Sequence, residues 1–108
     1  MSYSSNSVRH IVVFKYKEGV PDDHIQQITD AFRALQQKIP GIRSFEHGVN
    51  NSPEGKNHGF THVYTLTFDN LQARDTYLPH PAHAQFGALL QQLDAVADVF
   101  VVDYVPEG

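Results

Sequence analysis

Two segments near the ends of the chain, residues 8–16 and 96–105, carry apolar side chains on both faces of a predicted β-strand. Both are rich in β-branched and aromatic residues, which are typical of strands. Successive side chains of a strand point to opposite faces, so a strand with one face in water should alternate apolar and polar residues. These two segments do not alternate in this way. We therefore expect both faces of their sheet to be covered, which is a strong constraint on a chain of 108 residues.

The segment between Pro21 and Pro40 predicts a single amphipathic helix. Its apolar residues recur at steps of three and four, the period of one buried helical face. Pro40 and Gly41 then end the helix. The same reasoning gives the remaining elements: strands over 42–49 and 60–68, a polar turn over 50–59, a short helix that ends at Tyr77, and a helix that begins at Pro81.

This order of elements, β-α-β-β-α-β with a short additional helix before the last long one, is that of the ferredoxin-like split unit. The class is α+β, with the helices on one face of an antiparallel sheet. The other face would stay open, and large residues are expected there: Ile11, Val13, Phe100, Val102 and Tyr104. Soluble monomers rarely expose an apolar patch of this size. We therefore expect a homodimer, in which the open faces of two sheets pack together into a dimeric α/β barrel.

The composition excludes several classes of function. The chain has no cysteine, which removes disulfides, thiolate nucleophiles and thiolate metal sites. The net charge is −4 and Lys and Arg do not cluster, which argues against a nucleic acid as partner. No apolar run approaches the roughly 18 residues that cross a bilayer, so no membrane partner is expected. We expect a cytoplasmic protein with one domain over residues 8–106, preceded by a disordered tail over residues 1–7.

Several polar residues fall in rows that are otherwise apolar. Side chains two residues apart in a strand point to the same face. By this rule, three polar residues share a face with the apolar residues of their strands: His10, His62 and Asp103. On the last helix, His83 lies three residues before Phe86 and so falls on the apolar face. If these rows form one core, the four polar side chains converge in it. A buried carboxylate or imidazole is costly unless it is paired, so a cluster is expected rather than scattered burial.

Two interpretations of this cluster are open. In the first, an imidazole with a pKa of about 6.5 acts as a general base oriented by Asp103, and the hydroxyl of Tyr77 stabilises a developing enolate. In the second, the cluster is a hydrogen-bonded core network with no substrate. The spacing of His80 and His83 would suit a pair of metal ligands, but His80 is expected to cap the helix. Neither a metal nor another cofactor is therefore expected.

Four segments of the chain form a recognisable pattern. They are HIVVFKYK at residues 10–17, FTHV at 60–63, YLPHPAH at 77–83 and VDY at 102–104. Together they resemble the stress-responsive dimeric α/β barrel (Dabb) family, and the His-Pro-Ala-His junction at 80–83 is the most specific part. The resemblance extends over residues 8–106 and implies a ferredoxin-like monomer and a homodimeric barrel.

The resemblance also implies roles for individual residues. The family includes a plant enzyme that closes a linear polyketide by aldol condensation without a metal or cofactor. By position, His83 would be the base, Asp103 its orienting partner and Tyr77 the hydroxyl that anchors the substrate. His10 and His62 would line the same pocket. The apolar walls of this pocket are expected to come from Val12, Phe14, Tyr64 and Phe86, with the bulky Tyr64 ring shortening it.

We therefore expect a stress-associated homodimer that binds a small, partly apolar molecule, such as a carbonyl compound, among His, Tyr and Asp side chains. Two alternatives are open. One is cofactor-independent proton transfer next to a carbonyl, as in a polyketide cyclase or an isomerase, and the other is a structural or partner-binding dimer without catalysis. The space beside His83 is expected to separate these interpretations, because a purely structural dimer needs no cavity there.

Overall fold

The four β-strands form one antiparallel sheet in the order β2-β3-β1-β4. The computed structural model describes residues 6–108. In chain order the elements are β1 (Val8–Tyr16), α1 (Asp22–Lys38), β2 (Ile42–Val49), β3 (His62–Phe68), α2 (Leu71–Tyr77), α3 (Pro81–Leu93) and β4 (Val96–Tyr104). This confirms the ferredoxin-like fold. Strand β3 begins later than predicted, because the backbone N–H of Phe60 donates to the carbonyl of Asn57 in a turn instead of joining the sheet.

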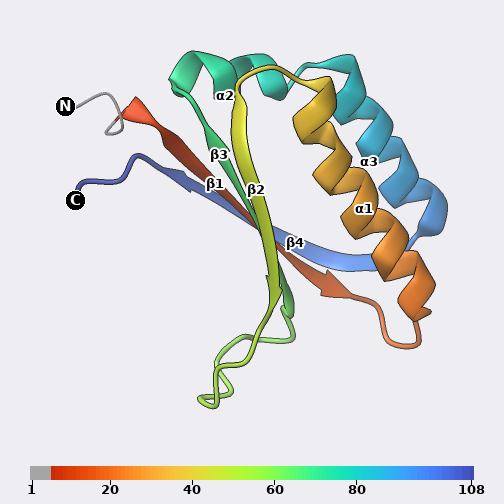
Figure 1. Ribbon diagram of the computed structural model, residues 1–108. Coiled ribbons are helices and arrows are strands. Elements are labelled where there is room, and N and C mark those ends of the chain that lie inside the picture. The colour runs from red at the N-terminus through yellow and green to blue at the C-terminus, as the bar shows by residue number, and fades with distance from the viewer. Residues whose placement is uncertain (1–5) are drawn as a thin grey trace.

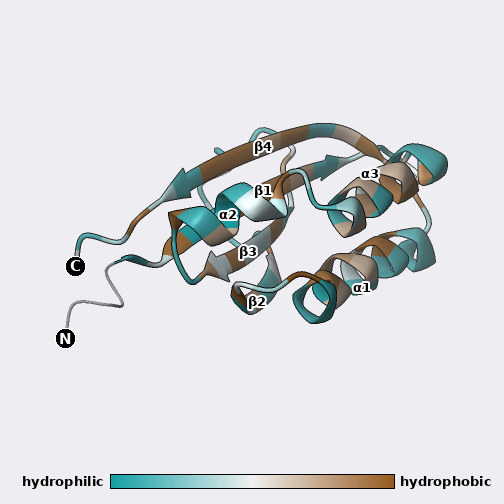
Figure 2. Ribbon diagram, turned by 90° about the horizontal axis from the view of Figure 1, so that it is seen from above, coloured by the Kyte–Doolittle hydropathy of each residue, from teal (hydrophilic) through white to brown (hydrophobic). Residues whose placement is uncertain are grey.

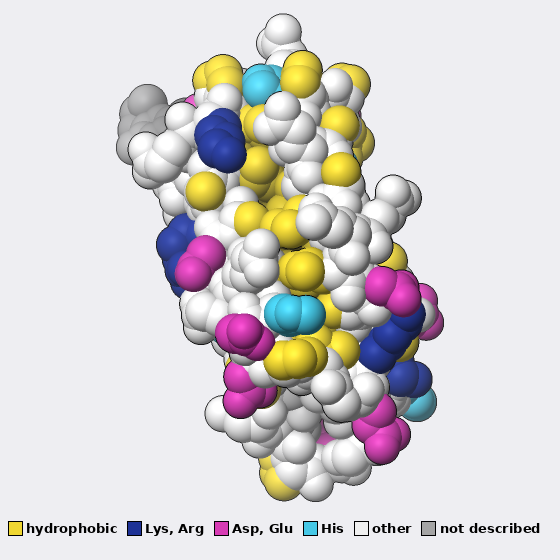
Figure 3. Space-filling view, turned by 90° about the vertical axis from the view of Figure 1, so that its right-hand side faces the viewer, with side chains coloured by type: hydrophobic (Ala, Val, Ile, Leu, Met, Phe, Trp, Pro, Cys, Tyr) yellow, Lys and Arg dark blue, Asp and Glu magenta, His cyan; other side chains and the backbone are white. Residues whose placement is uncertain are grey.

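The helices α1 and α3 cover one face of the sheet, and the opposite face carries no helix among the described residues (Figure 1). Seen from above, α1 and α3 lie side by side on the same side of the strands (Figure 2). We call the covered face the helix face and the other the open face. From the helix side, a seam of hydrophobic side chains runs along the molecule, with acidic and basic side chains on both sides of it (Figure 3).

Helix α1 buries one side because its apolar residues recur at helical spacing. Ile28, Phe32 and Leu35 on this side are each at most 2 % exposed. Asp22 and Asp23 lie in the first turn, where the helix dipole favours negative charge. The ring of Phe32 lies 6.3 Å from that of Phe14 on β1, so α1 is held to the sheet by aromatic contacts.

The caps of the other two helices determine how the chain passes between them. Asn70 caps α2 by accepting a hydrogen bond from the backbone N–H three residues further on, at 2.8 Å. His80 caps α3 as predicted, since its Nδ1 accepts from the backbone N–H two residues further on, at 3.0 Å. Only a short link therefore separates Tyr77 at the end of α2 from His83 in the first turn of α3.

Strand β4 is an edge strand that is exposed on both of its faces. On the open face Phe100, Val102 and Tyr104 are 53 %, 43 % and 51 % exposed, and Val99 and Val101 are 49 % and 50 % exposed on the helix face. The prediction that this strand is apolar on both faces is therefore confirmed. An exposed apolar edge strand is a ready template for pairing with another chain.

Most of the predicted disordered tail, residues 1–5, lies outside the described residues. Ser7, which the prediction includes in that tail, is only 2 % exposed. Its hydroxyl accepts a hydrogen bond from Arg9 Nη1 at 3.1 Å. In the part of the chain from residue 6 onward, every helix is too short or too polar to cross a bilayer.

Candidate functional site

A cavity of about 290 Å³ lies on the helix face, between α3 and the strands β1 and β4. Three polar side chains contribute to its wall: His10, Tyr77 and His83. The rest of the wall is apolar and comes from Val12, Phe14, Phe32, Leu78, Phe86, Gly87, Leu90, Val99 and Val101. Sites for small molecules usually measure about 300–1,000 Å³, so this cavity suits a ligand at the small end of that range.

His10 lies on β1 and is held by the neighbouring strand β4. The register of the two strands places it directly opposite Asp103. Its side chain is buried, and Nδ1 donates to Asp103 Oδ1 at 2.7 Å. An ionised carboxylate can only accept hydrogen bonds, so Nδ1 carries the proton. Nε2 of His10 is then the ring nitrogen that remains for another partner.

Asp103 has a second partner on α2. Its Oδ2 accepts a hydrogen bond from Arg74 Nη1 at 2.9 Å. The Nε atom of Arg74 donates to Asp75 at 2.8 Å. The hydrogen bonds to Asp103 and Asp75 raise the pKa of Arg74 above its usual value. Both carboxylate oxygens of Asp103 are thus engaged, which fixes the carboxylate and, through it, the ring of His10.

Tyr77 lies between the two imidazole rings. Its ring centroid is 5.6 Å from that of His10 and 4.6 Å from that of His83. Burial, and then the charge of Asp103, raise the pKa of Tyr77 above its usual value. The phenol therefore stays protonated at neutral pH and can donate. Its hydroxyl makes no hydrogen bond with any residue between 6 and 108. Because Tyr77 lines the cavity, this donor is available to a molecule there.

His83 is a neutral imidazole at neutral pH. Burial lowers its pKa below 6.5, a hydrogen bond with the backbone of Leu78 opposes this shift, and the nearby His10 lowers the pKa further. A neutral imidazole has one ring nitrogen with a free lone pair. His83 can therefore accept a proton from a molecule in the cavity.

The structure brings together four of the five polar residues predicted to share a site: His10, Tyr77, His83 and Asp103. The prediction that Asp103 orients His83 was wrong. Its carboxylate binds His10 and Arg74 rather than His83. The register between β1 and β4 places the carboxylate next to His10, whereas His83 approaches the cavity from α3.

The structure does not bring His62 to this cavity. His62 pairs with Phe14, four positions along β1 from His10, which is roughly 13 Å at about 3.3 Å per residue. Its ring lies edge-on to Tyr16 at 4.8 Å and lies 5.9 Å from the ring of His47. Burial, and then the nearby His47, lower the pKa of His62. The alternation of side-chain direction along the strands correctly places His10 and His62 on the helix face, but the two lie at different ends of it.

Tyr64 supports the cavity wall from behind rather than lining it. Its side chain is 0 % exposed, and its ring lies 5.0 Å from that of Phe32. The hydroxyl is 2.9 Å from that of Tyr16 and 2.8 Å from that of Thr29, so its hydrogen bonds are made within the core. The expected shortening of the pocket by Tyr64 is therefore absent. The other predicted wall residues, Val12, Phe14 and Phe86, do line the cavity.

Sequence reasoning missed Arg74 and Gly87. Arg74 lies three residues before Tyr77, a spacing that puts both side chains on the same side of α2. An inward-facing carboxylate at Asp103 needs a cation nearby, and this spacing was the signal that could have identified it. Gly87 follows His83 by four residues and lies on the same side of α3. It carried no chemical signal, because its contribution is a missing side chain.

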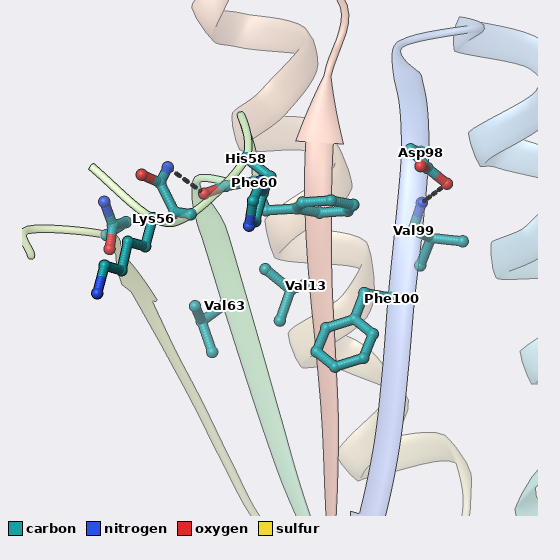
Figure 4. Close-up of a pocket in the computed structure, with 10 residues that line it drawn as sticks. Val13, Lys56, His58, Phe60, Val63, Asp98, Val99 and Phe100 are labelled. Atoms are coloured by element: carbon teal, nitrogen blue, oxygen red, sulfur yellow. Dashed lines mark hydrogen bonds between the residues drawn. The ribbon is translucent and has the colours of Figure 1, made fainter. Parts of the chain in front are cut away.

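A second cavity, of about 580 Å³, lies on the open face (Figure 4). Val13, Val63 and Phe100 lie side by side across three neighbouring strands at its floor, and the segment over 56–60 lies along one end. It is larger, but its ionisable groups come from the surrounding loop and from Asp98, whose carboxylate accepts from the backbone of the next residue. The acid and base groups that contact one another gather on the helix face, which we therefore take as the candidate site.

The helix-face cavity combines a proton acceptor, a proton donor and a fixed imidazole beside an apolar space. Such a set can remove a proton and stabilise the negative charge that develops on a nearby oxygen. Over residues 6–108, no three His, Asp or Glu side chains are placed to hold one metal ion.

Two curated relatives match almost the whole chain. The stress-response A/B barrel domain-containing protein HS1 of Arabidopsis thaliana is 29% identical over 106 residues, covering 98% of this chain and 95% of the relative. Olivetolic acid cyclase of Cannabis sativa is 25% identical over 100 residues, covering 93% of this chain and 97% of the enzyme.

Several solved structures are also similar to the chain over nearly its whole length. The protein At3g17210 of Arabidopsis thaliana superposes with a TM-score of 0.87 at 30% identity, covering 94% of this chain and 96% of that one. A hydroxynitrile lyase from Passiflora edulis has a TM-score of 0.85 at 27% identity, with 95% of each chain covered. A dimeric protein of ferredoxin-like fold from Bacteroides fragilis has a TM-score of 0.70 at 30% identity, covering 94% of this chain and 97% of that one.

The family comparison covers nearly every described residue. Residues 8–106 match the family of the Stress responsive A/B Barrel Domain, Dabb. The range contains all four strands and all three helices, and with them every residue of the helix-face cavity. The chain therefore belongs to the stress-responsive A/B barrel domain family.

Proposed function

We propose that the protein is a homodimer that binds a small, neutral, partly apolar molecule in the helix-face cavity. The observation that carries this proposal is the convergence of His10, Tyr77 and His83 on one otherwise apolar cavity of about 290 Å³. Polar groups in an apolar wall fix the orientation of a ligand, and the apolar remainder supplies affinity. The proposal includes a cytoplasmic location, which suits a chain without cysteine.

The electrostatics of the wall favour an uncharged ligand that carries a carbonyl or hydroxyl oxygen. The charges of Asp103 and Arg74 are engaged with each other behind His10. The groups that remain for the ligand are the phenol of Tyr77, which donates, and the neutral ring of His83, which can accept. A ketone, an aldehyde or a phenol satisfies both groups without bringing an unpaired charge into the cavity.

The same geometry supports a second candidate function, proton transfer next to a carbonyl. In this reaction His83 takes a proton from the carbon beside the carbonyl, and the C–H electron pair moves so that negative charge develops on the carbonyl oxygen. The hydroxyl of Tyr77 donates a hydrogen bond to that oxygen. His83 returns a proton when the enolate collapses. This step moves only protons and electron pairs within the substrate, and the relatives named as a cyclase and a lyase support a catalytic use of this fold.

The homodimer follows from the open face. Phe100, Val102 and Tyr104 are about half exposed there, next to the apolar cavity that Val13 and Val63 line. An apolar surface of this kind is more stable when a second copy covers it. Relatives of ferredoxin-like fold from Bacteroides fragilis and from a Jannaschia species are described as dimeric, at 30% and 26% identity.

The binding proposal is tested with 4-methylacetophenone, a small neutral ketone. Ligand-detected NMR should show saturable binding to the protein, and in D₂O the acetyl protons should exchange for deuterium faster with the protein than in buffer. His83→Gln should abolish the exchange, and a thermal unfolding curve shows whether the variant is folded. Binding without exchange would support the binding function alone. Absence of both would contradict the proposed function and favour a structural dimer.

The dimer is tested with Val102→Asp, which places an unpaired charge in the proposed interface. Light scattering should give the mass of a monomer for this variant and the mass of a dimer for the unaltered protein. Val49→Asp is a matched control. Val49, the last residue of β2, is 58 % exposed, but its side chain lies on the helix face and so outside the proposed interface. A Val102→Asp protein that keeps the mass of a dimer would show that the interface lies elsewhere.

A further inference from the structure

Gly87 lies in the middle of α3 and forms part of the cavity wall. Glycine in a helix interior is less favourable than alanine, because it loses more backbone freedom on folding and has the lowest helix propensity after proline. A glycine at this position therefore needs a reason.

Neither the backbone nor the packing supplies that reason. Glycines with a positive φ, where a side chain would be strained, are Gly19, Gly41, Gly55, Gly59 and Gly108, and Gly87 is not among them. At Gly41 a Cβ atom would lie 2.6 Å from the Cβ of Ala73, so no side chain fits. At Gly87, as at Gly48 on β2, a Cβ atom would meet nothing within 4 Å beyond its own surroundings in the chain. The space for a side chain exists and is left empty.

The empty space adjoins the polar end of the cavity. His83, Phe86, Gly87 and Leu90 lie at positions i, i+3, i+4 and i+7 and so form one stripe of α3. Gly87 is one helical turn after His83, and the wall opposite includes the half-exposed valines of β4. A side chain at position 87 would therefore fill the part of the cavity next to the proposed base.

We infer that Gly87 sets the size limit of the ligand. The missing side chain admits the apolar arm of a neutral carbonyl compound whose oxygen lies against Tyr77 and His83. This inference rests on the proposed function and deepens it, since it names the part of the site that selects among ligands by length. It also means that the chain gives up helix stability at position 87 to keep the cavity open.

The test compares Gly87→Ala and Gly87→Leu with the unaltered protein and with Ala88→Leu, an exposed neighbour on the same helix. The probes are 4-methylacetophenone and 4-butylacetophenone, with affinities from NMR titration and unfolding midpoints from thermal scans at one protein concentration. Gly87→Ala should raise the midpoint by roughly 4 °C. It should weaken the butyl compound about tenfold or more and the methyl compound less, because a pocket discriminates about 10–200-fold per methylene. Gly87→Leu should bind neither, and Ala88→Leu should bind both unchanged.

Other outcomes overturn the inference. A lowered midpoint in Gly87→Ala would show that the space is not free, and equal affinities in all four proteins would show that the ligand does not reach position 87. If the unaltered protein binds neither ketone, the proposed function fails, and the size limit is then judged with ¹²⁹Xe NMR, since xenon enters apolar cavities without polar contacts. A xenon shift lost only in Gly87→Leu would support the inference, and an equal shift in every variant would refute it.

Discussion

The two ends of the helix face are built from the same residue types and differ in whether their polar groups satisfy one another. At the β2 end, the hydroxyls of Tyr16, Tyr64 and Thr29 form a chain with separations of 2.9 and 2.8 Å. At the cavity end, the hydroxyl of Tyr77 makes no hydrogen bond with the rest of residues 6–108, and its ring lies beside an open space. We call these regions the closed end and the cavity end.

Burial alone does not identify a functional residue in this protein. Tyr64 and Tyr77 are 0 % and 1 % exposed, so exposure does not separate them. Buried polar groups in native proteins almost always have partners. Tyr64 has its partners within the core and needs no ligand, whereas Tyr77 has a free donor that a ligand can use. The hydrogen bonds of the closed end fit the core-network interpretation, whereas the free hydroxyl at the cavity end is the feature on which our binding proposal depends.

The largest expected effect is that of Tyr77→Phe on deuterium exchange of 4-methylacetophenone. Loss of one preorganised donor to a developing oxyanion slows a reaction by about 10²–10³-fold. Stability should change little, because the hydroxyl has no partner to lose within residues 6–108. Exchange rates by ¹H NMR and urea unfolding curves check both parts. An unchanged exchange rate would place Tyr77 with Tyr64 as a structural residue.

Tyr64→Phe should have the opposite result. It removes the shared partner of Tyr16 and Thr29 and leaves polar groups unsatisfied, at a cost of about 1–3 kcal/mol in the free energy of unfolding. The exchange rate should remain that of the unaltered protein. Urea unfolding at one protein concentration measures the first effect. A loss of exchange that exceeds the loss of folded protein would mean that the two ends are coupled.

Arg74→Met should have a smaller effect, confined to the cavity end. It removes the hydrogen bond of 2.9 Å to Asp103 and loosens the carboxylate that fixes His10. We expect exchange to slow roughly tenfold, or about 1.4 kcal/mol, which is slightly less than the about 1.5–3 kcal/mol of a direct hydrogen bond to a charged group, because Arg74 acts through Asp103 and His10. The NMR signal of the His10 Nδ1 proton should broaden as well. The control is Arg33→Met, which removes an exposed pair with Asp30 and should change neither readout.

The smallest expected effect is a dependence of stability on pH. Burial lowers the pKa of His83 at the cavity end and of His62 at the closed end below 6.5, and partial shielding from water, followed by the charge of Arg33, lowers that of the more exposed His47. As the pH falls below 6.5, the unfolded chain takes up protons that the folded chain does not, so the free energy of unfolding decreases until the folded pKa values are passed. Urea unfolding at pH 7.5, 6.5 and 5.5 gives the trend, and His62→Gln should reduce it. A stability that rises on acidification through this range would contradict the assignment of these three histidines.

The fold could be predicted because its signals are local. The spacing of Ile28, Phe32 and Leu35 predicts the helix α1. Along β1, successive side chains point to opposite faces, which gives the set of side chains that face the helices. The apolar character of both faces of β4 predicted an uncovered surface, which the exposure of Phe100 and Val102 confirms. The start of β3 was less predictable, because a turn hydrogen bond at Phe60 competes with strand pairing.

The candidate site could be predicted only in part. Parity gives the face of a strand on which a side chain lies but not its position along the strand, which depends on register. This is why His10 and Asp103 were correctly placed together while His62, on the same face, lies at the closed end. The contributions of Arg74 and Gly87 depend on how α2 and α3 pack, and neither is encoded in residue type alone.

Binding of the ligand at the cavity end can be followed through the histidine ring signals in long-range ¹H–¹⁵N NMR spectra. The spectra are recorded at neutral pH while 4-methylacetophenone is added. We expect the signals of His10 and His83 to move in a saturable way and those of His47 and His62 at the closed end to stay in place. A shift of the ring signals of His58, which lines the cavity on the open face, with no shift of those of His10 and His83 would show that the ligand binds on the open face instead.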